Sequence, residues 1–103
     1  MLKSIRVNYE ARDFFGQREM RSDGKDDPTE KDVEKAFKNV RRGDFYAHFN
    51  YADGTSDCVY ADYSDLQDGT WTLIHSESWN SRDDPVRLSP REVRKRVRDA
   101  IAR

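Results

Sequence analysis

Two Asp-Gly dipeptides constrain the fold most, because Asp-Gly is a strong signal for a tight turn between antiparallel strands. Asp53-Gly54 separates residues 45–51 from residues 56–63, and Asp68-Gly69 precedes residues 70–79. All three segments contain aromatic residues, which strands favour. The middle of the chain is therefore predicted to be a three-stranded antiparallel meander.

A two-residue turn at each dipeptide predicts the strand register. The pairs expected on one face are Phe49 with Cys58, Ala47 with Tyr60, Tyr60 with Glu77, and Asp62 with His75. Trp71, Leu73 and Trp79 would share this face, which is predicted to pack under the helices because it holds more aromatic area. A single bulge would reverse part of this assignment.

Two helices are predicted, one on each side of the meander. Asp27 and Ser89 are the expected caps; each is followed by a proline and, three residues after the cap, by a glutamate. Gly43 is expected to end the first helix. Apolar residues recur at helical spacing in both: Val33, Ala36, Phe37 and Val40 in the first, and Val93, Val97, Ala100 and Ile101 in the second.

The N-terminal part adds one strand or two. Residues 4–9 alternate between apolar and polar side chains, which is typical of a half-buried strand. Residues 14–21 fit either a second short strand or an irregular arm. The predicted fold is a single α+β domain over residues 1–103, in the order β-(β)-α-β-β-β-α. Its antiparallel sheet has four to five strands, with both helices on one face.

Charge is strongly separated along the chain. No lysine or arginine lies between Arg42 and Arg82, although the chain has 19 of them, and this stretch holds seven acidic residues. Such separation attracts partners of opposite charge, and aromatic side chains are favoured interface anchors. A basic protein partner is therefore predicted. The expected contacts are the acidic Asp44, Asp57, Asp62, Asp65 and Glu77, with Tyr46, Tyr51, Tyr63 and Trp79 as anchors.

The basic C-terminal helix suggests a second hypothesis. Residues 87–103 hold seven basic and two acidic residues, so this helix could follow nucleic-acid phosphates. The residues expected to do so are Arg91, Arg94, Lys95 and Arg98. Alternatively, these cations form a solvated helix face, or they neutralise the acidic sheet within the fold or across a homodimer. The chain's pI of about 6.1 does not favour a dedicated DNA-binding protein.

Catalytic and metal-binding patterns are weak. Neither histidine stands in a cluster of metal ligands, so no metal and no cofactor is predicted. His48 and Cys58 are expected on opposite faces of the first hairpin, as an exposed imidazole and a buried thiol. Asp62 could orient His75 as a general base, but a structural cross-strand pair would have the same pattern. The chain is predicted not to be an enzyme, with Asp62 and His75 as the enzymatic alternative.

The remaining features indicate a cytoplasmic protein. No apolar run approaches the roughly 20 residues of a membrane-spanning helix. The first residues lack the apolar stretch of a secretory signal, and the lone Cys58 fits a reducing compartment.

The order of elements resembles that of small α+β inhibitory proteins. The segments that carry this resemblance are the helix start at residues 28–34, residues 43–46, the hairpin at residues 52–54 and the helix start at residues 89–93. The families are polymorphic-toxin immunity proteins and phage anti-defence proteins such as anti-CRISPRs. The resemblance covers most of the chain, includes no diagnostic motif and transfers no binding residue. It implies a non-enzymatic inhibitor of a nuclease or of another nucleic-acid-binding effector.

Overall fold

A computed structural model describes residues 5–12, 15, 17–25, 29–41 and 46–102. Its elements, in chain order, are β1 (Ile5–Arg12), β2 (Arg18–Lys25), α1 (Glu30–Arg41), β3 (Tyr46–Tyr51), β4 (Ser56–Tyr60), α2 (Tyr63–Asp68), β5 (Trp71–Ser76), β6 (Val86–Leu88) and α3 (Pro90–Ala102).

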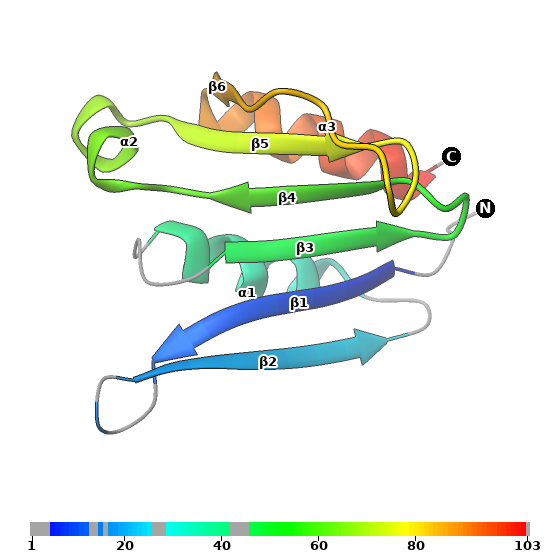
Figure 1. Ribbon diagram of the computed structural model, residues 1–103, viewed down its shortest axis with the longest axis horizontal. Coiled ribbons are helices and arrows are strands. Elements are labelled where there is room, and N and C mark those ends of the chain that lie inside the picture. Colours follow the sequence, from blue (N-terminus) through cyan, green and yellow to red (C-terminus); the bar gives the residue numbers. More distant parts are fainter. Residues whose placement is uncertain (1–4, 13–14, 16, 26–28, 42–45, 103) are drawn as a thin grey trace.

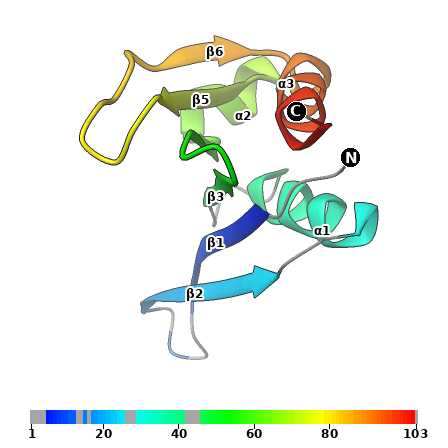
Figure 2. The same cartoon turned by 90° about the vertical axis from the view of Figure 1, so that its right-hand side faces the viewer.

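The strands form one antiparallel sheet in the order β2-β1-β3-β4-β5-β6 (Figure 1). Figure 2 shows α1 and α3 on the same side of this sheet. The predicted α+β class, with two helices on one face, is confirmed. Over the described residues the sheet has six strands rather than four or five. The ambiguous N-terminal segment contributes β2, and β6 was not predicted because it has only three residues.

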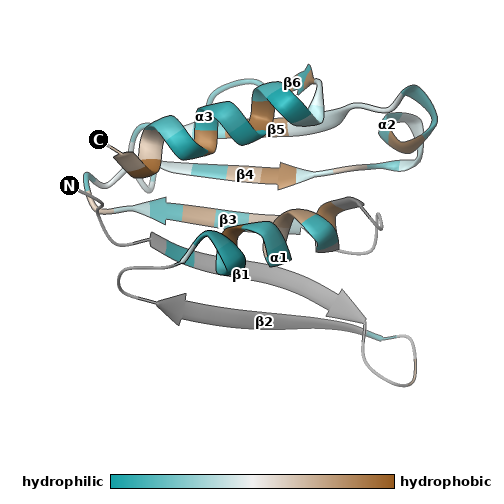
Figure 3. Ribbon diagram, turned by 180° about the vertical axis from the view of Figure 1, so that it is seen from behind, coloured by the Kyte–Doolittle hydropathy of each residue, from teal (hydrophilic) through white to brown (hydrophobic). Residues whose placement is uncertain are grey.

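The two predicted apolar stripes form the core between the helices and the sheet. All eight predicted stripe residues are buried, together with Phe49, Trp71 and Leu73 from the strands. The ring of Phe37 lies 5.5 Å from the rings of both Phe49 and Trp71, measured between centroids. Figure 3 looks onto this helical layer, whose outer side carries many hydrophilic residues. Within the described ranges, no helix has the length and apolar character needed to cross a membrane.

The helix starts agree with the sequence in one case and differ in the other. Ser89 caps α3 as predicted, because its hydroxyl oxygen accepts a hydrogen bond of 3.2 Å from the backbone N–H of Glu92. For α1 the cap is Thr29, whose own N–H donates to the carboxylate of Asp32 at 2.9 Å. The helix therefore begins at Glu30, later than predicted. Asp27, Pro28 and Gly43 lie outside the described residues.

The first hairpin has a three-residue loop instead of the predicted two-residue turn. The N–H of Tyr51 donates to the carbonyl of Thr55 at 2.9 Å, and Gly54 has a φ of 90°. This is a hairpin loop with a glycine bulge, and it shifts the register by one residue. The observed pairs are Phe49 with Asp57, Ala47 with Val59, and His48 with Cys58. The shift places Asp57 on the helix side of the sheet and Cys58 on the open side.

The second Asp-Gly dipeptide ends a helix instead of making a hairpin. Residues 63–68 form α2, and Gly69 closes it with a φ of 70°, a left-handed conformation that suits a helix end as well as a turn. The predicted pairs of Tyr60 with Glu77 and of Asp62 with His75 are therefore wrong. Tyr60 pairs with Thr72, and Asp57 pairs with His75.

Replacement of Gly54 tests the bulged turn. Gly54→Ala should lower the free energy of unfolding by about 1–2 kcal/mol, because a side chain is disfavoured at positive φ even where space is open. Gly54→Asn should cost less, since asparagine tolerates positive φ better. Urea unfolding of both variants measures the difference. Equal stability of the alanine variant and the wild type would contradict this turn geometry.

Candidate functional site

The carboxylates predicted to form one acidic patch lie in separate environments. Asp57 and Asp65 are buried, with exposed fractions of 4% and 0%. Asp62 and Glu77 are exposed, and Asp44 lies outside the described residues. The prediction that Asp57 and Asp65 belong to a partner-binding surface is therefore wrong.

Asp57 is the centre of a hydrogen-bonded chain on the helix side of the sheet. The hydroxyl of Tyr51 donates to its carboxylate at 2.7 Å, and Nδ1 of His75 donates at 2.8 Å. Nε2 of His75 donates in turn to the carboxylate of Glu77 at 3.0 Å. Tyr51 is buried, so it is not available as the partner-binding anchor that the sequence predicted. Tyr51 and Asp57 instead hold His75, which holds Glu77.

His75 therefore lies between two carboxylates. Burial lowers its pKa, but the hydrogen bonds and negative charges of Asp57 and Glu77 outweigh burial, so the pKa is raised above its ordinary value. With both ring nitrogens donating, the imidazolium form fits this geometry, and neither nitrogen is available to accept a proton from a substrate. The carboxylate of Asp62 is not near it and instead accepts a hydrogen bond from the N–H of Asp65, at the start of α2. The predicted Asp62–His75 pair is absent.

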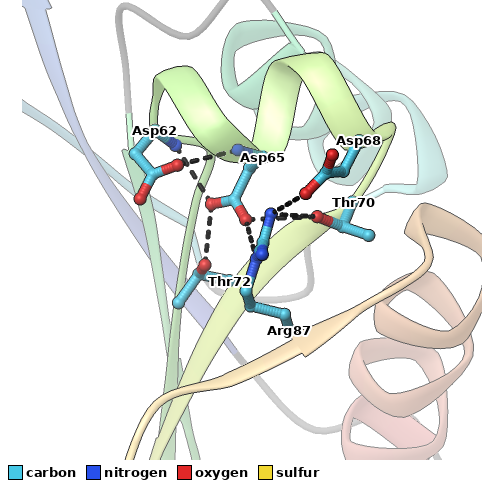
Figure 4. A network of polar contacts seen from close by, with 6 residues as sticks. All are labelled: Asp62, Asp65, Asp68, Thr70, Thr72 and Arg87. Atoms are coloured by element: carbon cyan, nitrogen blue, oxygen red, sulfur yellow. Dashed lines mark hydrogen bonds and ion pairs between the residues drawn. The ribbon is translucent and has the colours of Figure 1, made fainter.

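Asp65 joins α2 to β5 and β6 (Figure 4). Its carboxylate accepts hydrogen bonds from the hydroxyls of Thr72 and Thr70, at 2.7 and 3.1 Å, and from Nε of Arg87 at 2.7 Å. Burial raises the pKa of Asp65, but these hydrogen bonds and one from the backbone of Asp62 outweigh it, so the pKa is lowered. Asp65 is therefore a structural anion that attaches β6 to α2.

His48 and Cys58 lie side by side on the open face, not on opposite faces as predicted. The Cys58 Sγ lies 3.6 Å from Nε2 of His48. Burial raises the pKa of Cys58 to about 11, despite the opposing effect of Arg82, and burial together with Arg82 lowers the pKa of His48. At neutral pH the pair is a thiol beside a neutral imidazole, and a thiol is a poor nucleophile. In the part of the chain that the structure describes, no group of three or more metal-ligating residues occurs.

Two of the predicted aromatic anchors are strongly exposed. Trp79 has an exposed fraction of 95% and lies between β5 and β6, whereas Tyr63 on α2 has 78%. Tyr46 is half-buried, and its ring makes an edge contact with the imidazole of His48, with centroids 5.2 Å apart. Figure 1 shows α2 and the connection between β5 and β6 at opposite ends of β5. The predicted anchors therefore do not form one patch.

Residues 77–85, here called the Trp79 loop, combine the exposed tryptophan with acidic residues. The N–H of Asp83 donates to the carbonyl of His75 at 2.8 Å, and the N–H of Ser81 donates to the carbonyl of Ser78 at 3.1 Å. Glu77, Asp83 and Asp84 are exposed and lie within five residues of Trp79 in the sequence. The two aspartates were missed because they follow Arg82, outside the stretch without basic residues. Their position four and five residues after Trp79 in the sequence was the available signal.

The four basic residues predicted on the last helix do come together. Arg91, Arg94, Lys95 and Arg98, with Asp99, line one hollow of about 430 Å³ on α3.

Comparison of the chain with protein-family models, with curated proteins and with solved structures gives no match. The resemblance to immunity and anti-defence proteins stays a prediction.

The pH dependence of stability tests the charged state of His75. A raised pKa in the folded state stabilises the fold below the unfolded value of 6.5, and this contribution is lost as pH rises through the folded pKa. Unfolding free energy should therefore fall as pH rises above about 6.5 into the mildly alkaline range, and His75→Gln should flatten that slope.

His48→Gln is the matched control for this measurement. Because the pKa of His48 is lowered in the folded state, His48 contributes stability above its unfolded pKa of 6.5, and this contribution is lost on acidification. Removal of the His48 imidazole should therefore leave the alkaline slope in place. A wild-type stability that does not change over this pH range would exclude the proposed imidazolium.

Proposed function

We propose that this chain is a non-enzymatic inhibitor that binds a basic, nucleic-acid-handling protein through the Trp79 loop. The observation that carries the proposal is the 95% exposure of Trp79 on a loop that also carries Glu77, Asp83 and Asp84. A large aromatic side chain held in water gains most when a partner covers it, and tryptophan is enriched among residues that dominate binding energy.

The loop is held in shape before binding. At the start of the loop, the carboxylate of Glu77 contacts the imidazole of His75, and the N–H of Asp83 donates to the carbonyl of His75. Within the loop, the hydroxyl of Ser78 donates to the side chain of Asn80 at 2.7 Å. Such constraint lowers the entropy lost when the loop is immobilised in a complex. The buried Tyr51 and Asp57 support this arrangement through His75, because His75 contacts both Asp57 and the first residue of the loop, Glu77.

The charge of the loop favours a cationic partner surface. Its three carboxylates outnumber its single cation, Arg82, and none of the described residues forms an ion pair with Asp83 or Asp84. Carboxylates form bidentate pairs with arginine, and arginine-rich surfaces are common where proteins bind nucleic acid. A nuclease or nucleic-acid-binding effector in the cytoplasm is the partner class that fits, and occlusion of its basic surface would inhibit it.

Of the residues predicted from sequence, Glu77 and Trp79 belong to this proposed site. Asp62, which caps α2, and Tyr63, at the first position of α2, are exposed but lie away from the loop, and they are not included. The proposal keeps the class suggested by the resemblance, immunity proteins and anti-CRISPR-type phage inhibitors, and moves the contact surface to residues 77–85.

Alanine replacement of Trp79 tests the proposal. Tagged wild-type protein and Trp79→Ala are used as baits in host lysate with quantitative mass spectrometry, and the enriched partner is then purified. The variant should weaken binding about 30-fold or more, mainly through faster dissociation, because such aromatic anchors contribute about 2 kcal/mol or more. Wild-type protein should inhibit the partner's nucleic-acid binding or cleavage, and the variant should not.

Tyr63→Ala is the matched control, since it also removes an exposed aromatic ring but at the other end of β5. Its affinity should stay close to that of the wild type. Retention of full affinity by Trp79→Ala, or an enriched partner with no basic nucleic-acid-handling surface, would refute the proposal.

Charge reversal tests the electrostatic part. Replacement of Asp83 and Asp84 by lysine should slow association roughly tenfold and flatten its salt dependence, because complementary charge acts mainly on the association rate. Stopped-flow measurements at low and high salt give both quantities. Charge reversal of the exposed Glu30, on α1, should change them little.

A further inference from the structure

The outer side of α3 carries a groove that the proposed inhibitor function does not use. Arg91, Arg94, Lys95 and Arg98 line its volume of about 430 Å³ with Asp99. Figure 2 shows α3 and the β5–β6 connection on opposite sides of the sheet. A molecule bound in the groove would therefore leave the Trp79 loop open.

We propose that this groove binds the sugar-phosphate backbone of a nucleic acid, independently of base sequence. The four cations occupy positions i, i+3, i+4 and i+7 of one helix, so they lie along one face. They span about 10 Å of helix axis, at about 1.5 Å per residue. Duplex phosphates repeat every ~3.4 Å of axis along each strand, so this row matches successive phosphates better than a single ion.

The groove keeps an excess of positive charge after its ion pairs are counted. Glu34 of α1 contacts Arg94 at 3.5 Å and Arg98 at 3.2 Å, and Asp99 lies 3.9 Å from Lys95. Two acids therefore face four cations. Arg91 forms no ion pair with any residue in the described ranges, and pairs as exposed as these are weak enough for phosphate oxygens to compete.

Arg94 lines the groove and also packs against aromatic residues of the core. Its guanidinium lies over the rings of Phe37 and Trp71, 5.5 and 5.6 Å from their centroids. Its Nε is buried and has no acceptor among the described residues. Because this side chain also packs against the core, substitutions at the other three cations test the site without disturbing the fold.

Base-specific contacts are not part of the proposal. The sequence of α3 contains no asparagine or glutamine, which would read adenine, and nucleic acid bound through phosphates alone is held without sequence preference. Binding should therefore be moderate and strongly dependent on salt.

Fluorescence anisotropy with a labelled 20-nucleotide duplex and a single strand of the same length tests the groove. Wild-type protein should bind, and affinity should fall steeply between about 50 and 200 mM salt. Arg98→Gln should weaken binding about fivefold and reduce the salt slope by about one, as the loss of one phosphate contact predicts. Arg91→Gln should do the same.

Arg96→Gln is the matched control, because it removes the same charge from the same helix at an exposed position that does not line the groove. It should change affinity less than twofold. Equal losses for Arg96→Gln and Arg98→Gln would show a general charge effect and overturn the site, as would the absence of binding at low salt.

Removal of the competing acid gives an opposite and sharper expectation. Glu34→Gln should strengthen binding about threefold, since it releases Arg94 and Arg98, whereas Glu30→Gln on the same helix should have a smaller effect. Circular dichroism confirms folding of each variant. An unchanged affinity for Glu34→Gln would count against the proposal.

Inorganic phosphate distinguishes a backbone site from a site for a single phosphate group. At matched ionic strength it should displace the labelled strand no better than chloride does. Specific displacement by phosphate would overturn the backbone assignment. The variant Trp79→Ala should bind nucleic acid like the wild type, so this test and that of the inhibitor function can fail separately.

Discussion

The left-handed backbone at Gly54 determines which side chains of β4 meet the helices. With the extra residue in the loop, Val59 and Asp57 point to the helical layer, and Cys58 joins the open face. Because side chains alternate along a strand, one residue of slip would exchange these sets. The hydrogen bonds that link Tyr51, Asp57 and His75 can form only in this register, and His75 in turn contacts Glu77, the first residue of the Trp79 loop.

The sequence predicted the parts of the fold that local chemistry decides. The apolar stripes of α1 and α3 lie where helical spacing placed them, and Ser89 caps α3. Local chemistry could not decide the role of Asp68-Gly69, because a glycine at positive φ serves a hairpin and a helix end equally well. Nor could it locate β6, whose attachment depends on Arg87 reaching Asp65, 22 residues away in the chain.

Only part of the candidate site could be predicted from the sequence, for a related reason. Composition shows that acidic and aromatic residues are concentrated in the middle of the chain, but it does not show which of them are buried in contacts within the fold. Asp65 is used to hold β6, and Asp57 to hold His75, so neither contributes to a surface. The charge separation persists in another form, with cations gathered along α3 and an acidic loop on the other side of the sheet.

The two tryptophans occupy opposite extremes of environment. Trp71 is enclosed in the core beside Phe37, while Trp79 stands almost wholly in water. Indole emission shifts to shorter wavelength in apolar surroundings, so the chain carries two intrinsic optical reporters with separate meanings. The blue component follows the integrity of the core, and the red component follows whatever approaches residues 77–85. Loss of structure and occupation of the loop are thus distinguishable in one spectrum without any added label.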